Sequence, residues 1–180
     1  ANTATVDGGE VNNAGTILIN GGTLDIKNTT GNLTNTGLIT TSNGQLKVGG
    51  IVTNNASANF NTSGGIVTVS TNGSTNSGTI SVSSGTLNFN GRNITNLTGG
   101  TIDQTGGILE SSNLIVNASS NVNFSTGTST FNGTFTNYGT VTASSGTPML
   151  NGLLINQAGG SLLVNGGTLI VRGAAANENY

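Results

Sequence analysis

The chain of 180 residues contains no cysteine, no histidine and no tryptophan. These absences exclude disulfides, zinc sites of the cysteine and histidine type, and acid–base catalysis by histidine. Four basic and six acidic residues give a net charge of −2, which leaves no basic surface for a nucleic-acid backbone. No apolar run approaches the ~18 residues of a membrane helix. We therefore expect neither nucleic-acid binding nor a helical membrane span.

Glycine, asparagine, serine and threonine make up 107 of the 180 residues. All four are poor helix formers, and such polar tracts could indicate disorder. Disorder normally comes with high net charge and few β-branched residues, whereas one third of this chain is apolar, mostly isoleucine, valine and leucine. The composition therefore favours an ordered, all-β protein.

Asparagine and glycine each recur with a common period of about 20 to 21 residues, which is the signature of a repeat protein. Spacings within each series lie between 19 and 23 residues. We expect eight repeats. The asparagine series is Asn13, Asn35, Asn54, Asn76, Asn96, Asn117, Asn137 and Asn156. The glycine series is Gly21, Gly44, Gly64, Gly85, Gly106, Gly127, Gly146 and Gly166.

Two apolar series share the same period. The first consists of Ile17, Ile39, Phe60, Ile80, Ile102, Val122, Val141 and Leu162. The second consists of Leu24, Leu46, Val67, Leu87, Leu109, Thr130 as an exception, Met149 and Leu169. Within a repeat the apolar positions alternate, as they do in a strand with one buried face.

Strands that meet their equivalents about 20 residues later, in the same direction, must pair in parallel, and short parallel coils without helices make a β-solenoid. We predict about eight coils with three short strands each, such as 79–82, 86–89 and a segment leading into Asn96. The rod would be roughly 40 Å long at about 4.8 Å per coil. Right-handed coiling is expected by analogy with parallel crossovers.

The predicted organisation is a strand-like segment over 1–10, a solenoid over 11–172 and a polar tail over 173–180. Stacked asparagines would bond from coil to coil at one corner, and glycines would form the turns. The strand-like N-terminal segment is a candidate contact between subunits, because solenoids without polar caps expose pairing edges.

The segments 32–39 (NLTNTGLI) and 20–26 (NGGTLDI) resemble the repeats of filamentous-haemagglutinin-type adhesins and of autotransporter passenger domains. The resemblance covers residues 11–171 and lies in the style of the repeat. It implies a secreted right-handed β-helix at a bacterial surface. Together with the start at Ala1 rather than methionine, it leads us to expect an extracellular or cell-surface protein from which a signal peptide has been removed.

No catalytic, cofactor-binding or metal-binding residues are expected. The repeat register places Asp25 over Lys47, which predicts a surface salt bridge rather than a catalytic pair. Asp103 and Glu110 should lie on different strands around a glycine turn, with no long insertion to build a cleft. Threonine pairs of the ice-binding type scatter over different coils, and the ten glycosylation triplets hardly exceed chance. We therefore expect a protein that is not an enzyme.

Three functions remain open. The first is a subunit of an extracellular fibre that stacks head to tail with copies of itself, because a heterologous contact that does not close propagates. The second is a stalk segment of a large surface adhesin or autotransporter passenger. The third, more distant, is a β-helix that binds or processes carbohydrate, with glycans as partners. The aromatic residues that usually form platforms for sugars are few, which counts against this third function. They are Tyr138, Tyr180 and five phenylalanines, of which Phe60, Phe89 and Phe124 should be buried.

Overall fold

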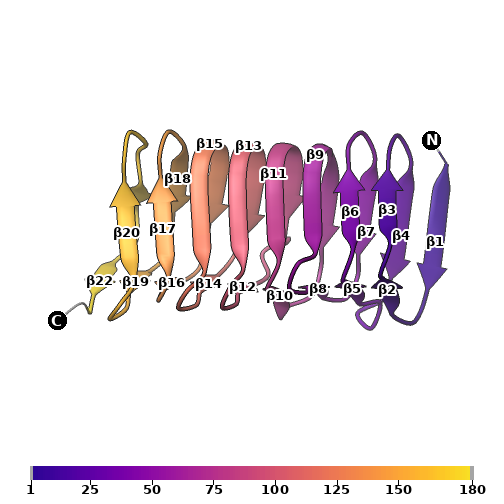
Figure 1. Cartoon of the computed structure of the whole chain (residues 1–180), viewed down its shortest axis with the longest axis horizontal. Helices are drawn as coiled ribbons and strands as arrows, with labels where there is room; N and C mark the ends of the chain where they lie inside the picture. The colour runs from indigo at the N-terminus through magenta and orange to yellow at the C-terminus, as the bar shows by residue number, and fades with distance from the viewer. Residues whose placement is uncertain (1, 179–180) are drawn as a thin grey trace.

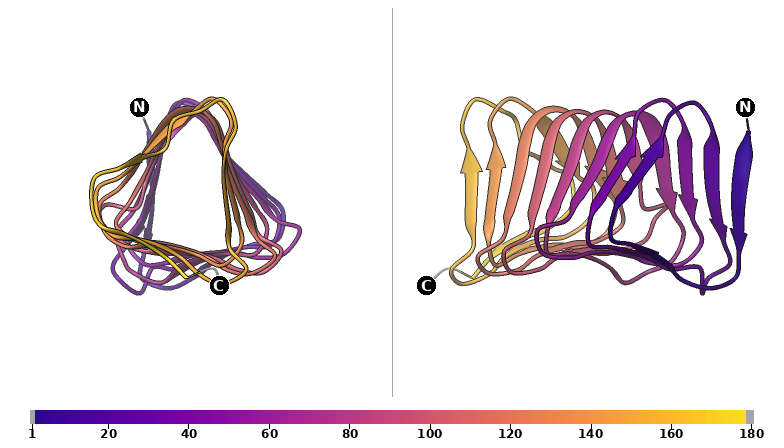
Figure 2. Two further views of the ribbon diagram at one scale, coloured as in Figure 1. Left: turned by 90° about the vertical axis from the view of Figure 1, so that its left-hand side faces the viewer. Right: turned by 45° about the vertical axis from the view of Figure 1, so that its right-hand side comes forward.

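The computed structural model describes residues 2–178, which form 22 β-strands and no helix (Figure 1). Neighbouring strands pair in parallel throughout the chain. Seen along its axis, the chain winds around a triangle with three flat faces (Figure 2). Front strands in Figure 1 run upward and rear strands downward while the coils advance from right to left, so the coil is right-handed. The predicted β-solenoid of about eight coils is confirmed.

Face 1 and face 2 meet at one corner, and four long strands continue around it. Face 1 consists of β3 (Thr16–Ile19), β6 (Leu38–Thr41), β17 (Thr140–Ala143), β20 (Ser161–Val164) and the first halves of the long strands. Face 2 consists of β1 (Thr3–Asp7), β4 (Thr23–Lys27), β7 (Gln45–Val48), β18 (Thr147–Leu150), β21 (Ile170–Val171) and their second halves. The long strands are β9 (Asn59–Val69), β11 (Thr79–Asn88), β13 (Thr101–Ser111) and β15 (Asn121–Phe131).

Face 3 is a separate sheet built from strands of three residues. Most of them read as a core residue, a threonine that points outward and an asparagine that points inward. Its strands are β2 (Val11–Asn13), β5 (Leu33–Asn35), β8 (Val52–Asn54), β10 (Ser74–Asn76), β12 (Ile94–Asn96), β14 (Leu114–Val116), β16 (Phe135–Asn137), β19 (Leu154–Asn156) and β22 (Ala175–Asn177).

The apolar residues stack into columns that fill the interior. On face 1 every member of the first predicted series pairs with the next, from Ile17 on Ile39 to Val141 on Leu162. The series lies inward because side chains alternate between the two sides of a strand. The first apolar series is therefore confirmed along the whole rod.

The second series is correct for its first five members and wrong for two later ones. Beyond Leu109 the column continues through Ser129 and Pro148 to Leu169, since Leu109 pairs with Ser129 and Ser129 with Pro148. Thr130 and Met149 lie one residue further on and point outward. Apolar character misled the alignment, because Met149 is apolar and lies directly after Pro148, which occupies the column. A one-residue slip exchanges the two sides of a strand.

Pro148 is buried in β18 on face 2, two residues after Gly146. Thr168 N donates to Gly146 O across the β18–β21 pair, so the alternation of parallel pairing would direct the next amide, at position 148, toward β21. Proline has no N–H, and the pair loses one ladder bond near the end of the rod.

The solenoid is longer than the predicted 11–172. Residues 3–7 form β1, which pairs in register with β4, and residues 175–177 form β22, which pairs with β19. Both flanking segments therefore add strands to the same stack. Ala1 and Tyr180 lie outside the described residues.

Differences in repeat length are absorbed at corners, because a one-residue shift within a strand would turn its core side outward. The register shifts between β9 and β11 fall between Val82 and Thr86, and those between β13 and β15 fall between Gln104 and Ile108. Both positions lie where face 1 turns into face 2. The strands on either side keep their inward and outward sides unchanged.

Aromatic rings close the core in the sixth coil. Phe124, Phe131 and Phe135 come from the three faces, and their rings pack edge to face at centroid distances of 5.9 and 5.2 Å. Phe60 and Phe89 are also buried, so the expectation that Phe60, Phe89 and Phe124 are core residues is confirmed. Two threonines, Thr41 and Thr62, interrupt the core on face 1 with buried hydroxyls that have no hydrogen-bond partner.

Replacing Ile80 by aspartate tests the register of face 1. Ile80 is 2% exposed between Phe60 and Ile102, so the new carboxylate would lie unpaired in a dry core. We expect a loss of about 4 kcal/mol or more in the free energy of unfolding, measured by urea titration. Thr79→Asp, which places the same charge on the outer side of the strand, should cost less than about 1 kcal/mol. Equal losses in both variants would contradict the register.

Thr62→Val should stabilise the protein. The substitution keeps the shape of the side chain and removes a buried hydroxyl that has no hydrogen-bond partner. Because an unsatisfied buried polar group carries an uncompensated desolvation cost, we expect a gain of about 1 kcal/mol in the same titration. A loss of similar size would mean that this hydroxyl has a partner in solution.

Candidate functional site

A ladder of asparagine amides runs along the inner edge of face 3. From Asn13 to Asn96, each side-chain Nδ2 donates to the Oδ1 of the asparagine in the next coil at 2.8 Å. The same bond joins Asn137 to Asn156 at 2.8 Å and Asn156 to Asn177 at 3.2 Å. The direction is constant, so Asn35, Asn54, Asn76 and Asn156 are each both a donor and an acceptor in this line.

Each ladder asparagine also holds the backbone of the adjoining corner. Asn76 Nδ2 donates to Gly78 O at 3.1 Å and to Thr101 O, in the next coil, at 2.9 Å. Asn54 bonds Ala58 and Thr79 in the same manner. Because these groups are buried, their bonds replace water that the corner cannot reach. The ladder therefore fixes the turn from face 3 to face 1 as well as the stacking.

The prediction of Asn117 as a ladder member is wrong. Val116 occupies the ladder position in β14, between Asn96 and Asn137 in the register, and Asn117 follows it on the outside of the corner. Leu114 and Val116 must both point inward for the coil to keep its core side, so the asparagine one residue later cannot. Ser120 Oγ lies 3.2 Å from Asn96 O and 2.7 Å from Asn117 O. Its single hydrogen is a donor at this corner and partly replaces the missing amide.

Asn177 is a ladder member that sequence reasoning missed. It follows Asn156 by 21 residues, which fits the period, but it stands in the segment read as a tail. Its strand begins with Ala175 in place of a larger apolar residue. That weak strand signal is why the ninth repeat of the ladder escaped notice.

Within the described residues, glycines occupy one position in all eight corners that lead from face 1 to face 2. A Cβ on Gly44 or Gly127 would lie 2.5 Å from the carbonyl oxygen of the glycine one coil earlier, so only glycine fits there. Gly44, Gly85, Gly127 and Gly146 of the predicted series lie in this column. The other four, Gly21, Gly64, Gly106 and Gly166, lie one residue earlier in the corner. The complete column is Gly22, Gly44, Gly65, Gly85, Gly107, Gly127, Gly146 and Gly167.

A second polar network crosses the core between faces 1 and 2. Gln104 is buried, and its Nε2 donates to Thr128 O at 2.8 Å and to Gly107 O at 3.2 Å. Ser129 Oγ donates to Gln104 Oε1. Every polar atom of the glutamine amide is therefore used in holding the corner, which is a structural role.

The charged residues are dispersed over the surface. Asp25 lies beside Lys47 in the register of β4 and β7, as predicted, but the structure gives no ion pair between these two described side chains. Asp103 and Glu110 belong to the single long strand β13, not to two strands, and lie on opposite sides of its corner. Each accepts a hydrogen bond from a neighbouring asparagine, Asn123 and Asn88 respectively. Within residues 2–178 no three acidic side chains gather closely enough to hold a metal ion.

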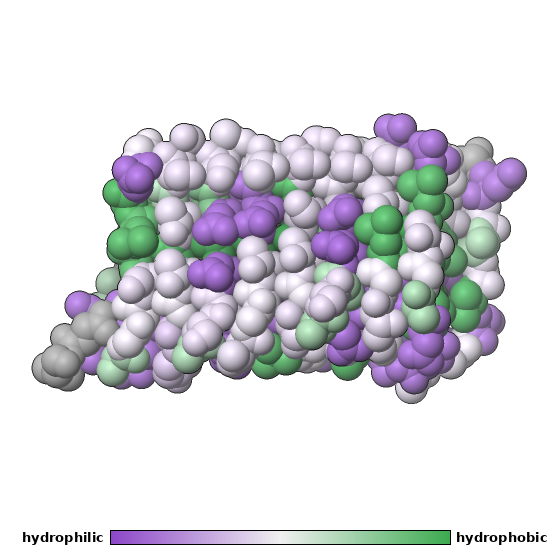
Figure 3. Space-filling view, viewed as in Figure 1, coloured by the Kyte–Doolittle hydropathy of each residue, from purple (hydrophilic) through white to green (hydrophobic). Residues whose placement is uncertain are grey.

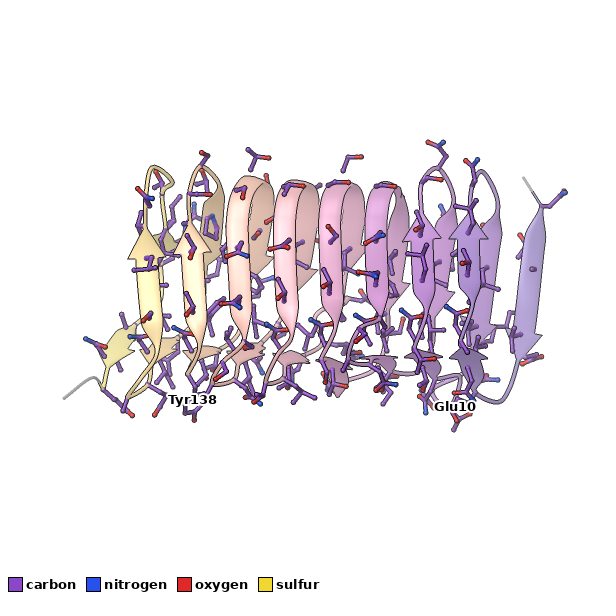
Figure 4. The ribbon with its side chains drawn as sticks, viewed as in Figure 1. Glu10 and Tyr138 are labelled. Carbon is purple, nitrogen blue, oxygen red and sulfur yellow. The ribbon has the colours of Figure 1, made fainter. Side chains whose placement is uncertain are left out.

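One shallow hollow on the outside of face 3 contains an exposed aromatic ring. Tyr138 is 41% exposed and lies with Ile115 and Thr136 beside the interruption of the ladder. In Figure 4 its side chain points away from the lower edge of the rod, as does Glu10 near the other end. Among residues 2–178 no helix could cross a membrane.

The two ends of the rod expose the interior columns. Seven apolar residues that pack on the core are only partly buried, and all of them lie in the first or last coils: Val6, Val11, Ile17, Leu24, Leu162, Leu169 and Val171. Interior members of the same columns, such as Ile39 and Phe60, are at most 1% exposed. A hollow at each end is lined by these strands. Within residues 2–178 the interior columns are therefore less covered in the first and last coils than between them.

Comparison with protein-family models, with curated proteins and with solved structures found no match to this chain.

Removing one rung of the ladder should cost far more than removing Asn117. Asn76→Ala removes the two N–H donors that Gly78 O, Asn96 Oδ1 and Thr101 O share, and the acceptor for Asn54, so we expect a loss of about 2 to 4 kcal/mol in the free energy of unfolding. Asn117→Ala should change it by less than about 0.5 kcal/mol, because this side chain lies outside the ladder. Chemical denaturation of both variants measures the difference. An Asn117→Ala loss as large as that of Asn76→Ala would overturn the assignment of Val116.

Proposed function

We propose that the chain is a structural protein whose copies stack end to end through the open ends of the solenoid into an extracellular filament. The supporting observation is the confinement of all seven partly buried core residues to the first and last coils. Apolar area exposed there would be removed from water by another coil of the same shape. Copies of one chain carry matching columns, so the occupant that fits each end best is the opposite end of a second copy.

The strand edges support the same proposal. Among residues 2–178, β1, β2 and β3 at one end and β20, β21 and β22 at the other are paired on one side only. Unpaired edges are templates for further strands, and a contact between opposite ends repeats without closing. The described ends carry neither a helix nor a long loop that would cover these edges.

The proposed role is mechanical. Backbone hydrogen bonds run along the axis, the asparagine amides add a second line of bonds parallel to them, and the apolar columns exclude water. In such a stack stability is approximately a sum of coil and interface terms, so it grows with length. The low charge and the resemblance to secreted β-helix repeats support the extracellular setting.

A stalk segment within a longer surface adhesin is the second candidate, because the same open ends would then be continued by further coils of one chain. Carbohydrate binding is the third, and Tyr138 with its hollow is the observation that favours it. The three proposals differ in what the 180-residue chain does alone. A filament subunit associates with itself, whereas a stalk segment or a glycan binder has no need to.

Thr5→Pro tests the role of the first strand. Thr23 N donates to Asn2 O across the β1–β4 pair, and parallel pairing alternates, so the Thr5 amide points away from β4 toward the free edge. Proline there removes a donor that only a second copy would use, and it hinders approach of another strand. We expect filaments of the unsubstituted chain by electron microscopy and sedimentation, and at least a tenfold higher protein concentration for assembly of Thr5→Pro (~1.4 kcal/mol).

Thr5→Val is the matched control, because it keeps the amide and a β-branched side chain. It should assemble like the unsubstituted chain, and all three proteins should unfold at similar urea concentrations. Monomeric rods of the unsubstituted chain at every concentration would contradict the filament and favour the stalk.

A further inference from the structure

The three faces of the rod do not contain the same number of strands. Within residues 2–178, faces 2 and 3 each have nine strand layers, from β1 to β21 and from β2 to β22, whereas face 1 has eight, from β3 to β20. The reason is the order of the described strands, which begin on face 2, pass to face 3 and then to face 1, and end on face 3. The two ends of the rod are therefore stepped and not flat.

Resting on the filament proposed above, we propose that the joint between two copies continues faces 2 and 3 strand by strand and leaves face 1 one strand short. In this joint β21 pairs with β1 of the next copy, and β22 with its β2. On face 1, β20 and the next copy's β3 are then separated by two layers. This leaves a slot the width of one strand on face 1 that no strand of residues 2–178 fills.

The columns fix the register of this joint. Continuing the observed pairing places the next copy's Val6 on Val171 and its Asn13 on Asn177. Both contacts repeat what interior coils already do: an apolar residue meets an apolar residue, and an amide of the ladder meets an amide. The Asn13 Oδ1 accepts from Gly15 N, and the interior pattern adds a second donor from the preceding coil.

Charge supports the same register. The next residue along face 2 is Arg172 in one copy and Asp7 in the other, and the joint brings them side by side. Opposite charges on neighbouring strands are favourable, and like charges there are unfavourable. These are the oppositely charged residues nearest to the two ends of face 2.

The alternative joint, with β3 of the next copy directly on β20, is excluded by overlap. Moving the copies one layer closer would put β1 of one copy in the place of β21 of the other, and β2 in the place of β22. These strands are already paired within their own copies: β1 pairs with β4, and β21 pairs with β18. A direct joint would therefore require at least two strands to leave their sheets.

The slot is bordered by exposed apolar side chains on both sides. Leu18 on β3 is 63% exposed, and Leu163 and Val164 on β20 are 50% and 53% exposed. In Figure 3 apolar patches lie toward the two ends of the front face, with polar residues between them. Interior coils carry mainly threonine, serine and asparagine at the positions equivalent to Leu18 and Leu163.

Pairs of engineered cysteines measure the step, and the chain has no cysteine of its own. Thr5→Cys/Ile170→Cys places thiols on adjacent layers of face 2 across the joint, about 4.8 Å apart, within the range for a disulfide. Leu18→Cys/Leu163→Cys places them two layers apart on face 1, about 10 Å, which is too far for a disulfide. Members of each pair lie at opposite ends of one rod, so a bond can form only between copies.

We expect oxidation of assembled protein to give covalent ladders on denaturing gels for the face 2 pair and monomers for the face 1 pair. A bismaleimide that spans about 10 Å should then link the face 1 pair. Disulfide ladders from Leu18→Cys/Leu163→Cys would overturn the stepped joint while leaving the filament intact. If the cysteine-free chain stays monomeric, the filament fails, and the joint fails with it.

Charge reversal gives an independent test of the register. Asp7→Arg or Arg172→Asp alone places like charges at every joint and should raise the concentration for assembly about three- to tenfold at low salt. The double variant restores an opposite pair and should return it close to the original value, although Asp7 also accepts a bond from Asn28 within its own copy. Thr128→Arg, in the middle of face 2, should have no effect. Failure of the double variant to rescue assembly would contradict the contact between Arg172 and Asp7.

Discussion

Parallel, in-register pairing from coil to coil is the constraint on which the structure depends. Once one coil pairs with the next at a spacing of about 4.8 Å, every residue lies beside its equivalent in that coil. Side chains at equivalent positions must therefore pack against or bond one another along the whole rod. Apolar columns satisfy this condition by packing, and the asparagine ladder satisfies it with an amide that both donates and accepts. Glycine satisfies it at a corner where the carbonyl of the previous coil leaves no room for a Cβ.

The interruptions of the columns show how much the constraint tolerates. Val116 replaces an amide in the ladder, and Ser120 supplies a nearby donor. Gln104 replaces an apolar residue on face 1 and brings its own partners, Thr128 and Ser129. The register continues on both sides of Val116 and Gln104, because the strands before and after them pair in the same way.

Much of the fold follows from the sequence because period and alternation are local signals repeated many times. The first apolar series was correct throughout, since nearly all its members are large β-formers in an otherwise polar chain. The candidate site was less predictable where two adjacent residues compete for one position. Asn117 beside Val116, Met149 beside Pro148 and Gly106 beside Gly107 differ by a single step. Only the inward or outward side of the whole strand decides between them.

The proposal of assembly follows from the sequence alone, through the lack of visible caps, whereas the proposed form of the joint does not. The unequal numbers of layers follow from where each face first and last receives a strand, which requires β1 and β22 to be placed on their faces. A segment such as 175–177, with two alanines, carries too little periodicity to be assigned a strand from the sequence. The unequal numbers of layers within residues 2–178 are thus visible only in the folded chain.

The axial rise per subunit in the filament, measured by cryo-electron microscopy, tests this account most directly. Nine strand layers on faces 2 and 3 at about 4.8 Å each predict a rise of roughly 43 Å, with one layer missing on face 1 in every subunit. A rise near 38 Å, equal to eight layers on all three faces, would contradict the stepped joint, because strands at the ends would then have left their sheets. Filaments with no relation between their rise and the strand spacing would contradict stacking along the solenoid axis altogether.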